Sequence, residues 1–277
     1  ISVKILSYGG IIKEINTPDR NGTYKNIVLD YDKIDSYSTD QSYLGAIIGR
    51  YANRIQNGKF KIDDSIYNLA KNNNENHLHG GLVGFDKVIW IAKTEIKDNS
   101  VSLILKYLSR DMEEGYPGNL KTSVIYTLTN DNELDIEYSA TTDKKTIINL
   151  TNHSYFNLTG EKEDIDDHLL KINSKEYIPV NNNLIPIGQF ENVFNSPFDF
   201  NEYKPIGKEI NSSNNQLYIG NGYDHCWVLN KKYNEYGYSA SLYDKNSGRL
   251  LEIYTDQPGI QVYSGNYLSD PFVKRQG

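Results

Sequence analysis

The sequence predicts an all-β protein with few or no helices. Apolar and polar residues alternate with a period of two along most of the chain, whereas the 3.6-residue period of an amphipathic helix is hard to find. Aromatic residues make up 12% of the chain, and most are tyrosines, which suit a sheet with a wet binding face. The chain has 277 residues and no obvious linker, so we expect one domain covering residues 1–277.

Individual strands and hairpins follow from this alternation and from turn residues between the runs. "KTSVIYTLTN" and "ELDIEYSATT" each place three apolar residues on one face and are separated by "NDN", a strong turn signal. We expect two more hairpins, "KFKIDDSIYNLA" and "YSASLYDKNSGRLLEIYTD", the latter turning at Asn246–Gly248. Further single strands are expected at residues 3–7, 11–16, 101–108 and 260–263.

Charge and composition exclude several classes of partner. The net charge of −7 and the lack of a basic patch argue against nucleic acid. No apolar run approaches the ~20 residues that span a bilayer. One cysteine, Cys226, permits no internal disulfide, and no signal-peptide pattern is present, so we expect a cytoplasmic protein. The chain opens with "ISVKIL" instead of methionine, and we expect that it is clipped at both termini.

Two motifs contain histidines that are candidate functional residues. "HLHGG" holds His77 and His79 two residues apart, which in a strand would put both on one face and could form a metal pair. The alternative is a loop edge with one functional or structural imidazole, favoured because no spacing supplies a third and fourth ligand. "NLTNHSYFNLTG" places His153 between polar neighbours at the end of a strand.

Two further motifs offer groups that could bind a polyhydroxylated ligand. "GRYANRI" holds Arg50, Asn53 and Arg54 after an apolar strand, and Arg and Asn both present fixed planar donors. The alternative is a solvated strand end. In "GYDHCWVL", Asp224 either caps a turn or accepts a hydrogen bond from a hydroxyl or an imidazole. No nucleotide-binding glycine pattern and no G-x-S-x-G elbow is present.

Taken in order, five motifs resemble the aldose 1-epimerase family: "GRYANRI", "NHLHGG", "NLTNHSYFNLTG", "GYDHCWVL" and "TDQPGIQVYSGNYL". The resemblance runs from "YGGIIKEINTPDRNGTYKNIVLDYD" to "KRQG" and so covers nearly the whole chain. It implies a large antiparallel β-sandwich, called a supersandwich. It also implies an enzyme that interconverts the α and β anomers of free aldohexoses such as galactose and glucose, without a cofactor or metal, as a monomer or homodimer.

The resemblance also implies roles for individual residues. His153 matches the general acid that protonates the ring oxygen, and His79 matches a second histidine that helps position that oxygen. Four residues match positions that hold sugar hydroxyls: Arg54, Asn53, Asp224 and Gln261. His168 and His225 match structural positions. Ring opening needs an acid and a base that exchange protons near neutral pH, and the ordinary histidine pKa of ~6.5 suits this.

One family residue lies outside the sequence. The base of the family is a glutamate, and "FVKRQG" resembles the residues just before it, so we expect this glutamate just beyond Gly277. Two alternatives to a hexose epimerase stay open. One is a non-catalytic carbohydrate-binding protein on the same scaffold, and the other is a relative acting on hexose 6-phosphates.

Overall fold

The structure is a computed structural model that describes residues 1–39, 41–160 and 164–268. The chain divides into two compact units. Unit 1 comprises Ile1–Asn16 and Val28–Tyr155, and unit 2 comprises Thr17–Ile27 and Phe156–Gly277. Each unit is described by itself below, and the single domain expected from the sequence stays a prediction.

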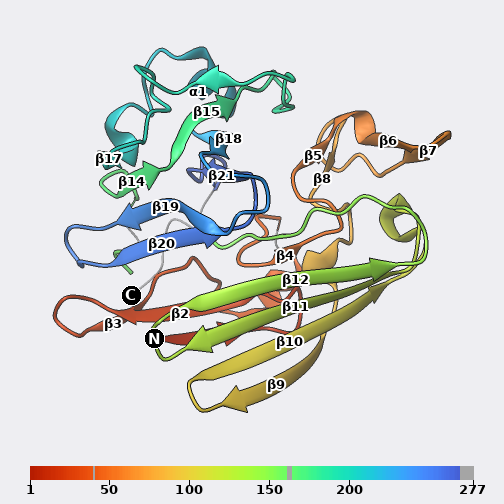
Figure 1. The fold of residues 1–277 in the computed structure, drawn as a ribbon, viewed down its shortest axis with the longest axis horizontal. Helices are drawn as coiled ribbons and strands as arrows, with labels where there is room; N and C mark the ends of the chain where they lie inside the picture. Colours follow the sequence, from red (N-terminus) through yellow and green to blue (C-terminus); the bar gives the residue numbers. More distant parts are fainter. Residues whose placement is uncertain (40, 161–163, 269–277) are drawn as a thin grey trace. The chain divides into compact units, whose positions relative to one another are not determined.

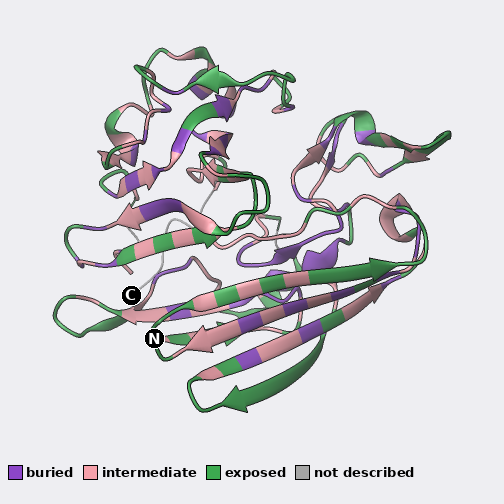
Figure 2. Cartoon of the chain, viewed as in Figure 1, coloured by how far each residue is buried: buried purple, intermediate pink, exposed green. Residues whose placement is uncertain are grey.

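The largest sheet of unit 1 has four antiparallel strands in the order β12-β11-β10-β9 (Figure 1). The strands are β9 (Ile91–Lys97), β10 (Ser100–Ser109), β11 (Leu120–Thr129) and β12 (Leu134–Thr142). Leu120, Val124 and Tyr126 are buried on one face of β11, and the burial alternates along the strand as the period of two predicts (Figure 2). The predicted β11–β12 hairpin is confirmed, with Leu128 opposite Leu134.

Shorter elements complete unit 1. β1 pairs antiparallel with β2, β6 with β7, β4 with β13, and β5 with β8. The predicted hairpin at residues 59–68 is therefore confirmed. The remaining strands and short 3-10 helices are β1 (Ser2–Ile5), β2 (Ile12–Pro18, whose last two residues lie in unit 2), η1 (Ile34–Ser38), β4 (Ile47–Ile48), β5 (Arg54–Ile55), η2 (Gln56–Gly58), β6 (Lys59–Ile62), β7 (Ser65–Asn68), β8 (His77–Leu78), η3 (Phe85–Lys87), η4 (Glu113–Gly115) and β13 (Thr151–Asn152).

Unit 2 contains two four-stranded antiparallel sheets, in the orders β17-β14-β19-β20 and β16-β15-β18-β21 (Figure 1). The predicted third hairpin is confirmed as β19–β20, with Tyr243 opposite Leu250. The elements of unit 2 are β3 (Tyr24–Asn26), β14 (Leu169–Ile172), β15 (Ser174–Ile178), β16 (Glu191–Asn192), β17 (Lys204–Pro205), η5 (Ile206–Lys208), α1 (Asn215–Gly220), β18 (Asp224–Leu229), β19 (Gly237–Tyr243), β20 (Leu250–Thr255) and β21 (Gly259–Tyr263).

An aromatic cluster fills the core of unit 2. Tyr177 and Phe198 stack with parallel rings whose centroids are 4.0 Å apart, and Trp227 lies 5.6 Å from Phe198. Trp227 donates a hydrogen bond from its indole N–H to the Phe198 carbonyl at 3.0 Å. Buried aromatic rings of this kind contribute a large apolar area, and the satisfied indole avoids the penalty of a lone buried donor.

The prediction of an all-β fold with few helices is confirmed. The strand pairings named above are antiparallel, and α1, of six residues, is the only α-helix in the described ranges. Asn214 caps α1 by accepting a hydrogen bond from the Gln216 amide at 2.8 Å. No helix formed by these residues has the length and apolar character needed to cross a membrane.

A buried arginine ties loops together in each unit. Arg50 is 2% exposed, and its guanidinium donates to the carbonyls of four residues and to one hydroxyl. Arg249 is 6% exposed, and the groups to which it donates are backbone carbonyls. Arg50 is therefore neither a ligand-binding group nor the solvated strand end considered from the sequence. Its five fixed donors suit a cluster of carbonyls that surround one side chain.

Three buried histidines are structural and neutral. His225 is fully buried; its Nδ1 accepts from the Asp224 amide at 3.1 Å, and burial lowers its pKa to about 4. His168 Nε2 accepts from the Leu158 amide at 2.9 Å, and burial lowers its pKa too. The environments of His168 and His225 agree with the structural positions that the family resemblance implies. The third, His77, is described with the site.

Replacing Arg50 with lysine should destabilise the protein by roughly 3 kcal/mol, because a single ammonium cannot satisfy the carbonyls that the planar guanidinium binds. Urea unfolding would measure the change. The matched control is Arg110→Lys, since Arg110 is exposed and lends only its carbonyl to Arg50. That control should stay within about 0.5 kcal/mol of the wild type. An equal effect of the two substitutions would contradict this role for Arg50.

Stability should fall with acidification below about pH 6.5, before the carboxylates titrate. The folded pKa of His225 lies below its unfolded value, so its contribution is complete above about pH 6.5 and is lost as the pH falls towards about 4. Comparing unfolding free energies at about pH 7 and about pH 5 measures the loss. His225→Asn keeps an acceptor for the Asp224 amide but cannot titrate, so the variant should show a shallower dependence. An unchanged slope would count against this assignment.

Candidate functional site

His153 directly follows β13, and the short ladder between β13 and β4 holds its backbone. The His153 amide donates to the Ala46 carbonyl at 2.9 Å, and the Gly45 amide donates to the His153 carbonyl at 2.9 Å. Asn152 strengthens the same contact, because its Nδ2 donates to the Gly45 carbonyl at 2.9 Å. The predicted place of His153 at a strand end is confirmed, and the sheet fixes where its imidazole begins.

His79 lies outside any strand, contrary to the period-two interpretation of "HLHGG". β8 ends at Leu78, and His79 has a φ of 51°, in the left-handed region. Gly80 follows with a φ of 89°, and a Cβ there would lie 1.7 Å from the Gly49 carbonyl oxygen, so only glycine fits. The carboxylate of Glu114 then accepts from the amides of Leu82 and Val83 at 2.9 and 3.0 Å, which secures the loop.

The tautomer of His79 is set by the backbone. The Asn53 amide donates to His79 Nδ1 at 3.0 Å, so Nδ1 is an acceptor and the neutral ring carries its proton on Nε2. Removal from water lowers the pKa of His79 well below its ordinary value, and the neighbouring basic groups His153, Arg54 and Lys87 lower it further. His79 is therefore neutral near pH 7 and presents an Nε2–H donor.

His77 is separated from His79 in role. It is fully buried, with Nδ1 2.8 Å from the Ala70 carbonyl and Nε2 2.6 Å from the Tyr116 hydroxyl. Both of its ring nitrogens are thus used by the protein, so the metal pair considered from the sequence is not supported. Within the described ranges, no three His, Cys, Asp or Glu side chains gather as a metal site would require.

The imidazoles of His79 and His153 lie together at the surface of unit 1. Their ring centroids are 5.1 Å apart and their planes meet at 89°. Tyr155 packs on the far side of His153, with ring centroids 5.0 Å apart, and its hydroxyl donates to the Ser42 carbonyl at 3.0 Å. Both residues are half-buried. The arrangement places a histidine fixed as a neutral donor beside a second imidazole.

Arg54 belongs to the same unit and is oriented by two asparagines. Its Nε donates to Asn73 Oδ1 at 3.0 Å, and its Nη1 donates to Asn53 Oδ1 at 3.3 Å. Asn53 Oδ1 also accepts from the Arg54 amide at 2.9 Å. Asn53 thus serves both neighbours, since its amide N–H holds His79 and its side chain holds Arg54. Asn73 was not identified from the sequence.

Asp224 and Gln261 are brought together in unit 2. They lie on the paired strands β18 and β21, and Gln261 Nε2 donates to Asp224 Oδ1 at 2.8 Å. Asp224 is half-buried and Gln261 is exposed. Asp224 begins β18, as the position of "GYDHCWVL" before an apolar strand predicts. The pair offers a carboxylate and an amide for hydrogen bonds to hydroxyl groups.

Two residues beside the histidines carried no recognisable signal in the sequence. The Tyr43 ring lies 4.8 Å from that of His79 and 5.9 Å from that of His153, measured between centroids. Lys87 places its ammonium 5.1 Å from the centroid of the Tyr43 ring. The "FVKRQG" segment lies outside the described residues, and so does the glutamate expected after it.

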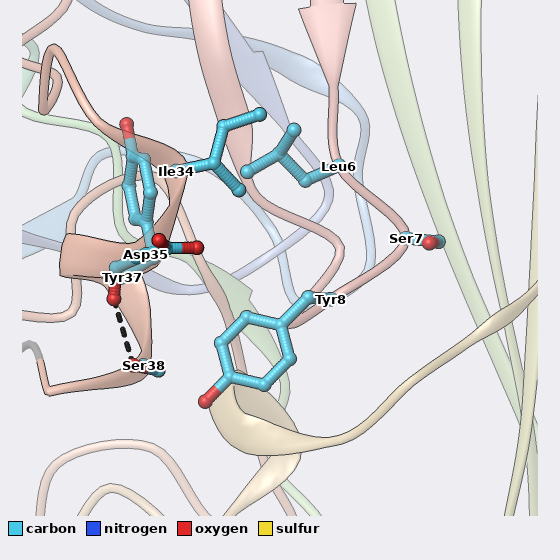
Figure 3. A pocket seen from close by; sticks show the side chains of 7 residues that line it. All are labelled: Leu6, Ser7, Tyr8, Ile34, Asp35, Tyr37 and Ser38. Carbon is cyan, nitrogen blue, oxygen red and sulfur yellow. Dashed lines mark hydrogen bonds between the residues drawn. The ribbon is translucent and has the colours of Figure 1, made fainter.

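A separate hollow in unit 1, of about 360 Å³, lies away from these histidines (Figure 3). Its lining is largely apolar and contains one carboxylate, Asp35. The Ser38 hydroxyl donates a hydrogen bond to the Asp35 backbone carbonyl at 2.7 Å. It gathers no acid–base pair, so its lining offers no catalytic arrangement. The lining residues are Leu6, Ser7, Tyr8, Ile34, Asp35, Tyr37 and Ser38.

Similarity to known proteins extends over the whole chain. The family model described as Aldose 1-epimerase matches residues 1–277. The chain is 41% identical to galactose mutarotase of Bos taurus over 278 residues, covering 100% of this chain and 78% of the relative. It is 42% identical to aldose 1-epimerase of Haemophilus influenzae over 252 residues, covering 90% of this chain and 71% of the relative.

The similarity also includes a solved structure. The structure of galactose 1-epimerase from Lactobacillus acidophilus superposes with a TM-score of 0.87 at 32% identity, covering 98% of this chain and 77% of that chain. The structural match also supports the fold class that the sequence predicts. The motifs that carry the resemblance are thus accompanied by a matching fold, and the chain belongs to the aldose 1-epimerase family.

Proposed function

We propose that the protein interconverts the α and β anomers of free aldohexoses such as galactose and glucose. The single observation that carries the proposal is the His79–His153 pair of unit 1, with its fixed tautomer and its 5.1 Å ring separation. The names of the relatives, galactose mutarotase and aldose 1-epimerase, support the same reaction and substrate class. No phosphate or metal ligand is needed for the step.

In the proposed mechanism, His153 is the general acid and His79 holds the substrate. His153 gives a proton to the ring oxygen as the C1–O5 bond breaks, while a base removes the proton of the anomeric hydroxyl. The open aldehyde rotates about its C1–C2 bond and closes again on either face, with the proton transfers reversed. His79 donates a hydrogen bond from Nε2–H to the same oxygen and does not take up a second proton, because its lowered pKa disfavours the imidazolium.

The remaining proposed site residues bind hydroxyl groups. In unit 1, Arg54 and Asn53 offer donors whose directions are fixed by their bonds to one another. In unit 2, the hydrogen-bonded Asp224 and Gln261 offer an acceptor and an amide. We propose the family glutamate, expected just beyond Gly277, as the base. Glu252 does not fill that role, because it is exposed on β20, as its place in the strand pattern predicts.

Polarimetry of freshly dissolved α-D-galactose tests the function with the natural protein. We expect faster mutarotation than in buffer alone, and a ~10²–10⁴-fold loss of the enzymatic rate in His153→Ala, since a general acid supplies about this factor. Hexose 6-phosphate serves as the comparison substrate and should react more slowly. Failure to accelerate free hexoses while still binding them would favour the carbohydrate-binding alternative. Full activity of His153→Ala would exclude the proposed acid.

Glutamine substitutions should separate the roles of the two histidines. His79→Gln retains a neutral N–H donor near the Nε2 position, so we expect only a ~10-fold loss of kcat, the value of one hydrogen bond. His153→Gln removes the titratable proton and should lose ~10²–10⁴-fold. Both variants are compared by polarimetry, with circular dichroism as the folding control. Equal losses would show that the two side chains share one role.

A further inference from the structure

Tyr43 touches both histidines of the candidate site without belonging to any motif. Its ring meets His79 edge-on, with centroids 4.8 Å apart and an interplanar angle of 63°. The same ring lies 5.9 Å from that of His153, tilted by 39°. The two imidazoles also contact each other at 5.1 Å. Three aromatic rings therefore contact one another pairwise, and Tyr43 is the one that is not an imidazole.

The backbone holds Tyr43 in an uncommon conformation. Its φ is 57°, in the left-handed region that a bulky aromatic residue rarely adopts. The turn that follows is closed by a hydrogen bond from the Ala46 amide to the Tyr43 carbonyl at 3.1 Å. Such conformations persist where the surrounding structure fixes them, and they cluster at functional sites. The left-handed backbone is what directs this side chain towards the two imidazoles.

The segment that carries His153 fixes the turn from both sides. The Tyr155 hydroxyl donates to the Ser42 carbonyl, just before Tyr43, at 3.0 Å. The Gly45 amide donates to the His153 carbonyl at 2.9 Å, just after the turn begins. Tyr43 is thus tied to the backbone of His153, while its ring reaches His79, which comes from a different segment. The side chain therefore links two histidines that separate loops supply.

Lys87 steadies the other end of this arrangement. Its ammonium lies 5.1 Å from the centroid of the Tyr43 ring, a distance typical of a cation–π contact. The same ammonium is 2.5 Å from Asp86 Oδ2, and Asp86 is 5% exposed, so the cation is anchored to a buried carboxylate. Because η3 carries Asp86 and Lys87, a third segment limits the movement of the Tyr43 ring.

We propose that Tyr43 is a positioning residue, whose ring acts as a spacer that keeps the imidazoles of His79 and His153 at a right angle. Without the ring, each imidazole gains room to tilt towards the other, and the two would no longer point at the same substrate oxygen. A misplacement of ~1 Å at a proton-transfer site can cost ~10²-fold in rate. The proposal rests on the proposed function for its effect on the rate and deepens it by naming what aligns the acid with the hydrogen-bond donor.

The decisive variant is Tyr43→Asn, because asparagine tolerates a left-handed backbone and removes only the ring. We expect kcat to fall ~10–100-fold with KM changed less than ~3-fold, since alignment and not binding is lost. Tyr43→Phe keeps the ring and should retain kcat within ~3-fold of the wild type. Tyr31→Asn is the matched control: it removes another half-buried ring of unit 1, which contacts Tyr37 at 5.0 Å. This control should leave kcat unchanged.

Nuclear magnetic resonance of the histidine ring protons supplies a readout independent of activity. Wild-type protein should show Overhauser contacts from Tyr43 ring protons to both His79 and His153, and Tyr43→Asn should move the signals of both imidazoles while Tyr31→Asn moves neither. Absent contacts in the wild type, or a Tyr43→Asn variant with wild-type kcat and unmoved signals, would overturn the proposal. If the wild type itself is inactive, the proposed function fails, whereas the ring contacts still decide the placement of Tyr43.

Discussion

The hydrogen bond from the Asn53 amide to His79 Nδ1, 3.0 Å long, is the interaction on which the site of unit 1 depends. It decides which nitrogen of His79 carries the proton, and so turns an ambiguous imidazole into a defined donor. Burial and neighbouring cations lower the pKa of His79 and keep the ring in this form. The ring of the second histidine, His153, lies 5.1 Å away.

Short strand pairings, not the long strands, position the two histidines. β4 and β13 share two residue pairs, and β5 and β8 also share two. His153 follows β13 directly and His79 follows β8 directly. Each histidine comes directly after a two-residue strand, so strand pairing fixes the position of the backbone just before it. The residues described at the histidine site come from outside the long strands β9–β12, and the alternating burial of β11 supports the apolar packing of unit 1.

Buried polar side chains hold backbone segments in place through hydrogen bonds, as strand pairing does elsewhere. Arg50 and Arg249 each bind several backbone carbonyls from one guanidinium and so join segments that are far apart in the sequence. His77 bridges the Ala70 carbonyl and the Tyr116 hydroxyl. Loop-rich regions can be rigid under these conditions, because buried side chains hold their backbone at fixed positions. Rigidity of this kind is what proton transfer between preset groups requires.

The sequence by itself determined the all-β class, the three hairpins and the family, because alternation, turn residues and the order of motifs are local properties of the chain. It also singled out His79, His153, Arg54 and Asp224. Only the tertiary structure showed that Arg50 and Arg54 differ in role, and that His77 and His79 do. Only it revealed Tyr43 beside His79. The reason is physical: burial, tautomer and orientation depend on partners far along the chain, such as Ser109 for Arg50 and Asn53 for His79, and identical residue types acquire different roles from different partners.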